Sequence, residues 1–220
     1  MKNNITELVF ILDRSGSMAN LARDTIGGFN SLIEKQKKKD GKCFVTTVLF
    51  DTRFETLHDR VPLESVAPMT DEEYTPGGCT ALLDAMGDTI RHIAAIHKYA
   101  RPEDVPENTI FVITTDGLEN ASRRFGTDEI RRMVDHERDK YGWQFVLLGA
   151  NIDAFAAAAS IGIRPEQSAN FHADADGMRL SFEAVDNAVS AVRMSMPVCG
   201  NWKESVEADY KNRKMSAKQN

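Results

Sequence analysis

Short apolar runs alternate with helical patterns along almost the whole chain, and this alternation constrains the fold more than any other feature of the sequence. The first run, residues 8–12 (LVFIL), contains no polar residue, as expected for a strand buried on both faces of a parallel sheet. Apolar residues at helical spacing follow it, among them Leu21, Phe29 and Leu32. The repetition of this order predicts an α/β fold built from β–α units.

The expected elements follow the order β-α-β-β-α-β-α-β-α-β-α. Residues 43–50 and 53–58 are rich in β-forming residues and only Asp51-Thr52 separates them, which predicts a hairpin whose second strand lies at the sheet edge. Together the elements predict a doubly wound, mostly parallel sheet with one antiparallel edge strand and helices on both faces. The other expected strands are residues 8–12, 109–115, 144–149 and 169–172. The first expected helix ends in the lysine-rich residues 35–39, and the later helices are residues 80–99, 128–138, 153–161 and 177–196.

The length and charge of the chain limit its organisation and its partners. With 220 residues, no internal repeat and no Ser- or Gly-rich linker, we expect a single domain over residues 1–200. Residues 201–220 are polar and charged, and from Lys203 onward we expect a frayed helix or a loose tail. A formal net charge of -6 argues against broad, nonspecific binding to nucleic acid or to an anionic membrane.

The cysteines and the apolar segments indicate the compartment. Cys43, Cys79 and Cys199 occur without a C-x-x-C pair, so neither a zinc knuckle nor a disulfide scaffold is indicated. The N-terminal apolar stretch is too short for a signal peptide, and no run approaches the length of a membrane span. We therefore expect a cytoplasmic protein with reduced thiols, in which Cys79 is buried and packs its loop rather than serving as a redox group.

Three loops carry side-chain oxygens at positions that the predicted topology brings to one edge of the sheet. Residues 13–17 (DRSGS) follow the first strand directly, residues 77–80 (GGCT) open a helix, and residues 114–117 (TTDG) end a central strand. In open α/β sheets, ligands bind outside the carboxyl ends of the strands. We therefore expect the three loops to form one site.

Five residues of these loops form a candidate site for a divalent cation: Asp13, Ser15, Ser17, Thr80 and Asp116. Mg²⁺ prefers an octahedron of oxygen ligands, often keeps bound water, and is commonly held by one or two carboxylates. Three hydroxyls with two carboxylates would leave the ion less neutralised than a cage of three or four carboxylates. An external carboxylate would then be attracted to the open coordination position.

Each residue of this set also has an ordinary structural explanation. Asp13 or Ser17 could cap the helix that follows, Thr80 could cap its own helix, and Asp116-Gly117 is a common turn pair. The D-x-S-G-S run, however, stands directly after a buried strand, and two further oxygen-bearing loops stand at equivalent places. This joint pattern favours the metal site over the separate explanations.

The ligand set Asp13-x-Ser15-x-Ser17, then Thr80, then Asp116 resembles the metal-ion-dependent adhesion site (MIDAS) of von Willebrand factor type A (vWA) domains. The resemblance extends beyond these positions and covers most of the chain. The similar stretches lie within about residues 5–197 and are FILDRSGSM, TIGGFNSLIEKQ, TPGGCTALLDAMG, VITTDGLEN and FVLLGANIDA, which are similar to stand-alone bacterial or phage members of the family.

This resemblance implies a Rossmann-like sheet with Mg²⁺, or Mn²⁺ or Ca²⁺ in its place, at the carboxyl ends of the strands. It further implies that Ser15, Ser17 and Thr80 ligate the ion directly, and that Asp13 and Asp116 do so through water. A Glu or Asp of a partner protein would complete the octahedron. In related domains, metal ligation is coupled to movement of the last helix.

The leading functional hypothesis is a non-catalytic domain that engages an acidic residue of another protein through the metal. The sequence has no Ser-His-Asp order, no G-x-S-x-G motif and no phosphate-binding G-x-x-x-x-G-K motif. One alternative is a Mg²⁺-dependent phosphoryl-transfer hydrolase with Asp13 as the nucleophile, although Ser15 stands where a second carboxylate would serve as acid and base. Another is an assembly element that keeps the fold alone. Gly27-Gly28 in the first helix indicates either close packing or a moving helix.

Overall fold

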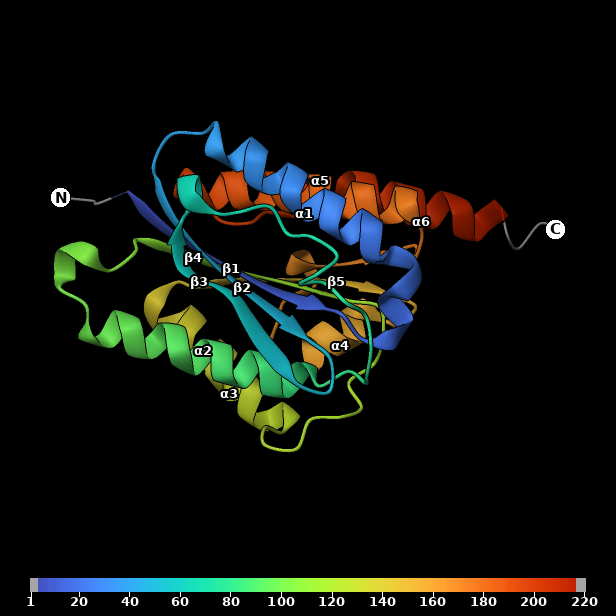
Figure 1. Cartoon of the computed structure of the whole chain (residues 1–220), viewed down its shortest axis with the longest axis horizontal. Coiled ribbons are helices and arrows are strands. Elements are labelled where there is room, and N and C mark those ends of the chain that lie inside the picture. Colours follow the sequence, from blue (N-terminus) through green and yellow to red (C-terminus); the bar gives the residue numbers. More distant parts are fainter. Residues whose placement is uncertain (1–3, 217–220) are drawn as a thin grey trace.

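Six strands form one sheet in the order β3-β2-β1-β4-β5-β6 in the computed structural model, which describes residues 4–216 (Figure 1). Every neighbouring pair is parallel except β2 and β3, which are antiparallel. The predicted doubly wound, mostly parallel α/β sheet with one antiparallel edge strand is thereby confirmed. The strands are β1 Ile5–Asp13, β2 Lys42–Phe50, β3 Phe54–Pro62, β4 Asn108–Thr115, β5 Gln144–Ala150 and β6 Ser168–Phe171.

Helices cover both faces of the sheet, as the sequence predicts. Figure 1 shows α1, α5 and α6 on one face and α2, α3 and α4 on the other. The hydrophobic core has the same division, because apolar residues of α1 and α5 cluster with one face of the sheet and those of α2 and α3 with the other. The helices are α1 Ala22–Lys37, α2 Leu82–Tyr99, α3 Thr127–Tyr141, α4 Ala154–Ser160, α5 Ala175–Arg193 and α6 Glu204–Ser216.

The central strand β1 contributes side chains to both halves of the core. Leu8, Phe10 and Leu12 lie on the side of α1 and α5, whereas Val9 and Ile11 lie on the side of α2 and α3. All of these side chains are 0% exposed, which explains why the apolar run has no polar interruption. Burial of one such side chain contributes about 1.5–3 kcal/mol relative to an exposed position. The pairing register of β1, and with it the position of the loop that follows, is therefore strongly determined.

The C-terminal segment differs from the frayed helix or loose tail expected from Lys203 onward. Residues up to Ser216 form helix α6, which packs on α5 and β6. The segment is anchored by Trp202 and Val206, which are 4% and 1% exposed, and by Lys203, whose Nζ donates a 2.6 Å hydrogen bond to the carbonyl oxygen of Ser168. Two buried apolar side chains, one buried lysine and the 2.6 Å ion pair between Arg213 on α6 and Asp174 thus dock a largely polar helix. Residues 217–220 of the expected tail lie outside the described part of the chain.

Gly28 is the point of closest approach between α1 and α5. A Cβ atom at this position would lie 2.1 Å from Cδ2 of Phe182 on α5, a distance that real Cβ atoms do not show. Gly27, one residue earlier, has no atom within 4 Å of the corresponding position. The structure therefore explains Gly28 by close packing against Phe182, while Gly27 has no such contact.

We expect the two glycines to respond in opposite directions to the same substitution. Gly28→Ala should lower the free energy of unfolding by about 1–3 kcal/mol, because Phe182 must move out of a packed position. Gly27→Ala should raise it by about 0.5–1 kcal/mol, because alanine is the better helix former and meets no neighbour. Urea denaturation of the two variants measures both values. Equal effects would contradict the packing explanation.

Candidate metal centre

The topology brings the three oxygen-bearing loops together at the carboxyl ends of β1 and β4. Asp13 is the last residue of β1, and Asp116 comes directly after the last residue of β4. These strands are neighbours in parallel register, with Leu12 opposite Thr114. Thr80 lies just before the N-terminal end of α2, and its backbone N–H donates a 3.0 Å hydrogen bond to Oδ1 of Asn120, in the loop that follows Asp116.

The hydroxyls and the second carboxylate are directed toward one another. The Oγ atoms of Ser15 and Ser17 are 3.2 Å apart, and Ser17 Oγ donates a 2.5 Å hydrogen bond to Oδ1 of Asp116. Gly117 leaves open the space beside them, since a Cβ there would lie 3.4 Å from Thr80 Oγ1 and 3.9 Å from Ser17 Oγ. Four of the five predicted side chains therefore border a common space.

Asp13 has a different position from the other four residues. Its side chain is 0% exposed, and both of its carboxylate oxygens are engaged by protein donors. Oδ1 accepts a 2.7 Å hydrogen bond from the backbone N–H of Ser15, and Oδ2 accepts a 2.6 Å hydrogen bond from Oγ1 of Thr115. Asp13 thus holds the D-x-S-G-S loop against the end of β4. This placement is compatible with indirect ligation through water.

Two buried carboxyl groups in one site affect each other's ionisation. Burial raises the pKa of Asp13, and the charge of Asp116 adds to this effect, while hydrogen bonds from Thr115 and Ser15 oppose it. Burial also raises the pKa of Asp116, against the hydrogen bond from Ser17. A cation bound beside them would favour the ionised form of both groups.

The donor set fits a small, hard cation. An octahedron with ligands at roughly 2.0–2.1 Å has adjacent oxygens about 3 Å apart, and the Ser15–Ser17 separation of 3.2 Å is close to this value. The side chains of Ser15, Ser17, Thr80 and Asp116 offer oxygen donors, as Mg²⁺ and Mn²⁺ prefer. Within residues 4–216, no three His, Cys, Asp or Glu side chains converge into a different metal site.

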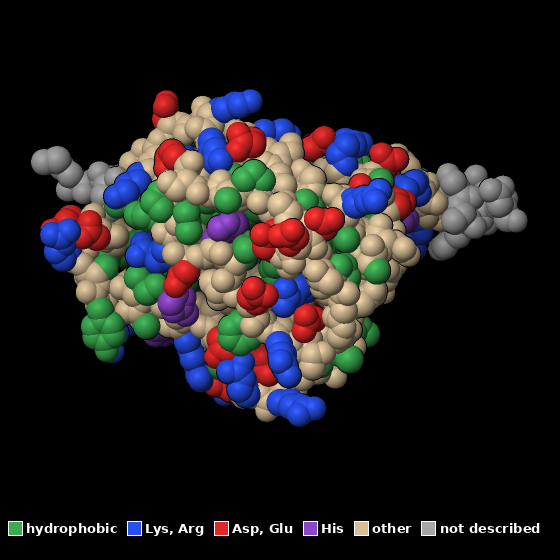
Figure 2. Space-filling view, in the orientation of Figure 1, with side chains coloured by type: hydrophobic (Ala, Val, Ile, Leu, Met, Phe, Trp, Pro, Cys, Tyr) green, Lys and Arg blue, Asp and Glu red, His purple; other side chains and the backbone are tan. Residues whose placement is uncertain are grey.

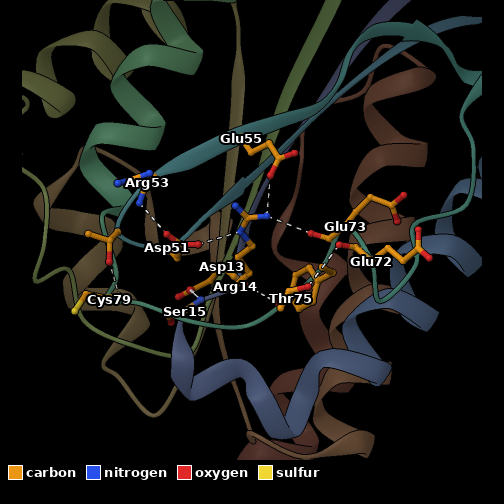
Figure 3. Close-up of polar contacts among 12 residues, drawn as sticks. Asp13, Arg14, Ser15, Asp51, Arg53, Glu55, Glu72, Glu73, Thr75 and Cys79 are labelled. Atoms are coloured by element: carbon orange, nitrogen blue, oxygen red, sulfur yellow. Dashed lines mark hydrogen bonds and ion pairs between the residues drawn. The ribbon is translucent and has the colours of Figure 1, made fainter.

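Arg14 connects the loop of the candidate site to two neighbouring segments (Figure 3). Its Nε donates a 3.1 Å hydrogen bond to Oδ2 of Asp51 in the β2–β3 turn, and Nη1 donates a 3.0 Å hydrogen bond to Oε2 of Glu55 on β3. The same Nη1 donates a 3.2 Å hydrogen bond to the carbonyl oxygen of Glu73. The acidic partners neutralise the guanidinium, so that its charge does not oppose a cation bound next to it.

The loop before Thr80 is held mainly by its backbone. Gly16 donates its N–H to the carbonyl oxygen of Gly78 at 3.2 Å, and Cys79 donates its N–H to Oγ1 of Thr52 at 2.8 Å. Gly78 has φ +69°, and a Cβ there would lie 2.7 Å from Thr52 Oγ1, so the position requires glycine. The prediction that Cys79 is buried is wrong: its thiol is exposed, because the loop packs through its main chain.

Three further residues, which no sequence motif indicates, hold the site in place. Asn120 accepts from the backbone N–H of Thr80, and Glu119 Oε2 accepts a 2.9 Å hydrogen bond from the N–H of Leu83. Asp84 on α2 accepts hydrogen bonds of 2.9–3.0 Å from the backbone N–H groups of residues 123–125. Each contact joins residues about 40 positions apart in the sequence, so no local pattern indicates it.

The strand order, together with a D-x-S-G-S loop at the carboxyl end of the central strand, defines a vWA-type α/β fold. The ArnB paralog VWA2 from Sulfolobus acidocaldarius superposes with a TM-score of 0.54 and 16% sequence identity, covering 84% of this chain and 45% of that chain. Proximal thread matrix protein 1 (PTMP1) from the mussel byssus, in a structure with a zinc-occupied MIDAS motif, superposes with a TM-score of 0.57 and 14% identity. That alignment covers 86% of this chain and 45% of PTMP1.

These similarities concern the fold, because the sequence identities are low. This chain spans less than half the length of the solved structures that it matches. The sequence itself matches no protein-family model and no curated protein.

Asp84 offers a test of the contacts that support the site. Burial alone would raise the pKa of Asp84, but the N–H groups of residues 123–125, together with the charge of Arg124, outweigh it and hold this pKa below its usual value. Asp84→Ala should lower the free energy of unfolding by about 1–3 kcal/mol at neutral pH, because these donors lose their acceptor. Since a lowered pKa stabilises the fold above the unfolded-state pKa, the difference from the wild type should shrink as the pH falls below about 4.

The control is Asp88→Ala, one turn further along α2. Asp88 forms an ion pair with the half-exposed Arg124, and a surface pair of this kind contributes about 0–1 kcal/mol. Urea denaturation between acidic and neutral pH measures both variants. A pH-independent effect of Asp84→Ala would contradict the role given to its carboxylate.

Proposed function

We propose that this protein binds a divalent cation through Ser15, Ser17, Thr80, Asp13 and Asp116, and through this ion engages an acidic residue of a partner protein. The observation that carries the proposal is the convergence of hydroxyl and carboxylate oxygens from three loops on the space beside Gly117. Mg²⁺ is the ion that we propose, with Mn²⁺ or Ca²⁺ as substitutes. The zinc-occupied MIDAS motif of PTMP1 supports metal binding by this fold.

The distribution of exposure supports capture of an external ligand. Asp13, Thr80 and Asp116 are 0%, 3% and 4% exposed, whereas Ser17 is exposed. A bound ion would therefore be enclosed by protein on one side and accessible on the side of Ser17. With only two carboxylates nearby, one of them already engaged by two donors, the ion would keep a strong attraction for a third carboxylate.

The surface beside the site supports a protein partner. Leu118, two residues after Asp116, is 65% exposed. An apolar side chain at the rim of a polar site is suited to contact with another protein. On the face shown in Figure 2, acidic and basic side chains are interspersed, which does not favour nucleic acid as the partner.

The alternative hypothesis, a phosphoryl-transfer hydrolase, requires Asp13 to attack a substrate. Both oxygens of its carboxylate accept hydrogen bonds from the protein, and the side chain is 0% exposed. This geometry suits a residue that positions a loop better than it suits a nucleophile. Metal-dependent turnover of p-nitrophenyl phosphate that is lost in Asp13→Asn would support the hydrolase instead.

We further propose that the protein acts in the cytoplasm. Cys79 and Cys199 are exposed and free, and Cys43 is buried and free, as expected in a compartment that keeps thiols reduced. Between residues 4 and 216, no helix is long and apolar enough to cross a membrane. The assignment to the stand-alone bacterial or phage type stays a prediction.

Ser17 gives a direct test of the metal site, because it is exposed and its replacement by alanine removes one proposed ligand without opening a space in the core. Ser17→Ala should weaken Mn²⁺ and Mg²⁺ binding by at least about tenfold, by loss of one oxygen ligand. Ser31→Ala, at an exposed position of α1 away from the site, is the matched control and should bind as the wild type does. Isothermal titration calorimetry measures both. Equal affinities of the two variants would refute the assigned ligand set.

Partner capture tests the second half of the proposal. The immobilised protein should retain a partner in Mg²⁺ and release it on addition of EDTA, and Asp116→Ala should retain none. Leu118→Ala should weaken capture while leaving the metal affinity unchanged, because its side chain would contact only the partner. Asp128→Ala, an exposed acid on α3, is the control. Capture that persists in EDTA would contradict engagement through the ion.

A further inference from the structure

A second cavity lies at the end of the sheet opposite the candidate metal centre. It lies between α2 and α3 and has a volume of about 450 Å³. Pro106 precedes β4 and Trp143 precedes β5, so this cavity is at the amino ends of β4 and β5, and the carboxyl end of β4 adjoins the metal site. Ala95, Val105, Pro106, Tyr141 and Trp143 supply apolar walls. A cavity of this size accommodates a small organic molecule.

Glu137 is the acidic residue of this cavity. It lies near the end of α3, is only 7% exposed, and lines the space beside Trp143. Its Oε2 is buried and has no hydrogen-bond partner among residues 4–216. The neighbouring Arg138 does not compensate it, since Arg138 pairs with Asp135 and Asp139. A buried carboxylate oxygen without a donor is costly, so a ligand that supplies a donor gains affinity.

No basic side chain around the cavity forms a hydrogen bond or an ion pair with the Glu137 side chain among the described residues. Nζ of Lys98 lies 5.3 Å from the ring centre of Tyr99, and Nζ of Lys140 lies 5.0 Å from the ring centre of Tyr141. His136 is exposed at the rim. Burial raises the pKa of Glu137, and the nearby imidazoles and Lys140 only partly oppose this.

His97, the other imidazole that lines the cavity, already faces a different acid. Its Nε2 lies 3.4 Å from Oε2 of Glu7 on β1, and the same oxygen accepts a 2.7 Å hydrogen bond from Nε of Arg60. The ring of His97 also packs edge-on against Trp143, with centroids 5.4 Å apart. His97 is thus held as part of the wall and leaves Glu137 to a ligand.

The chemistry of the walls selects the class of ligand. Within the described chain, no three His, Cys, Asp or Glu side chains gather to hold a metal ion, so a cation that needs only one carboxylate is favoured. We propose that this cavity binds a small organic amine, with its ammonium group paired to Glu137 and its apolar part against Trp143, Tyr141 and Pro106. Aromatic walls with a single acid are suited to such cations.

Two probes of similar shape and opposite charge test this proposal, 4-phenylbutylamine and 4-phenylbutanoate. Binding is measured in EDTA by calorimetry and by ¹H–¹⁵N chemical-shift changes at Trp143, so the result does not depend on the metal centre. We expect the amine to bind at least about tenfold more tightly than the carboxylate. Glu137→Gln should weaken amine binding about tenfold or more, whereas Glu129→Gln on the same helix should leave it unchanged.

Ala95→Phe provides a second test that keeps the carboxylate. Ala95 is exposed on α2, so a larger side chain there should fill the cavity without disturbing the core, and amine binding should be lost. This variant decides the question if Glu137→Gln fails to fold. Equal binding of the two probes, undiminished amine affinity in either variant, or absence of saturable amine binding would overturn the proposal.

Discussion

The candidate metal centre depends on the buried carboxylate of Asp13. This group ends the most buried strand of the sheet, and its two oxygens connect the backbone of Ser15 to the side chain of Thr115. The D-x-S-G-S loop is therefore fixed relative to β4 before any ligand is considered. An ionisable group buried to this degree is costly unless its interactions are satisfied, and the two donors together with a bound cation would satisfy them. Asp13 thus contributes both to the stability of the carboxyl end of the sheet and to the metal binding proposed there.

Hydrogen bonds between loops also hold the segments around Asp13 in place. Arg14 attaches the loop to the β2–β3 turn through Asp51, and Gly16 attaches it to the segment that carries Thr80. Asp84 attaches the start of α2 to the segment that follows Asp116. Asp13, Ser17, Thr80 and Asp116 are therefore each held by a hydrogen bond to a neighbouring loop or strand end, and Ser15 is held within its own loop. Such support from surrounding residues is what a site needs to keep its geometry without a ligand.

Much of the fold could be predicted from the sequence, because the central strands β1, β4 and β5 are short, largely apolar runs that are buried in the sheet. The run at residues 8–12 has no alternative to burial, and residues 13–17 must then emerge at the carboxyl end of a strand. The docking of α6 could not be predicted in the same way, since it depends on Trp202 and Val206 in an otherwise polar segment. The exposure of Cys79 follows from hydrogen bonds of the main chain, which do not depend on residue type.

The contacts around the site could not be predicted from the sequence for a related reason. Asp84 and the segment 123–125 are distant in sequence, and an aspartate in the first turn of a helix is equally well explained by the helix dipole. The buried Glu137 is similar, because on a charged helix it is indistinguishable in sequence from its exposed neighbours. Sequence patterns show which residues enter the core, but the pairing of polar groups across the molecule appears only when the elements are assembled.

The contact between Gly28 and Phe182 has a consequence for how the last large helix can move. The aromatic ring occupies a space that exists only where α1 lacks a side chain, and the positions one turn away, Asp24 and Leu32, both carry one. A gradual sliding of α5 along α1 would push the ring against these side chains. The packing therefore favours one axial position of α5, and any shift of this helix along α1 requires the ring of Phe182 to leave the space beside Gly28.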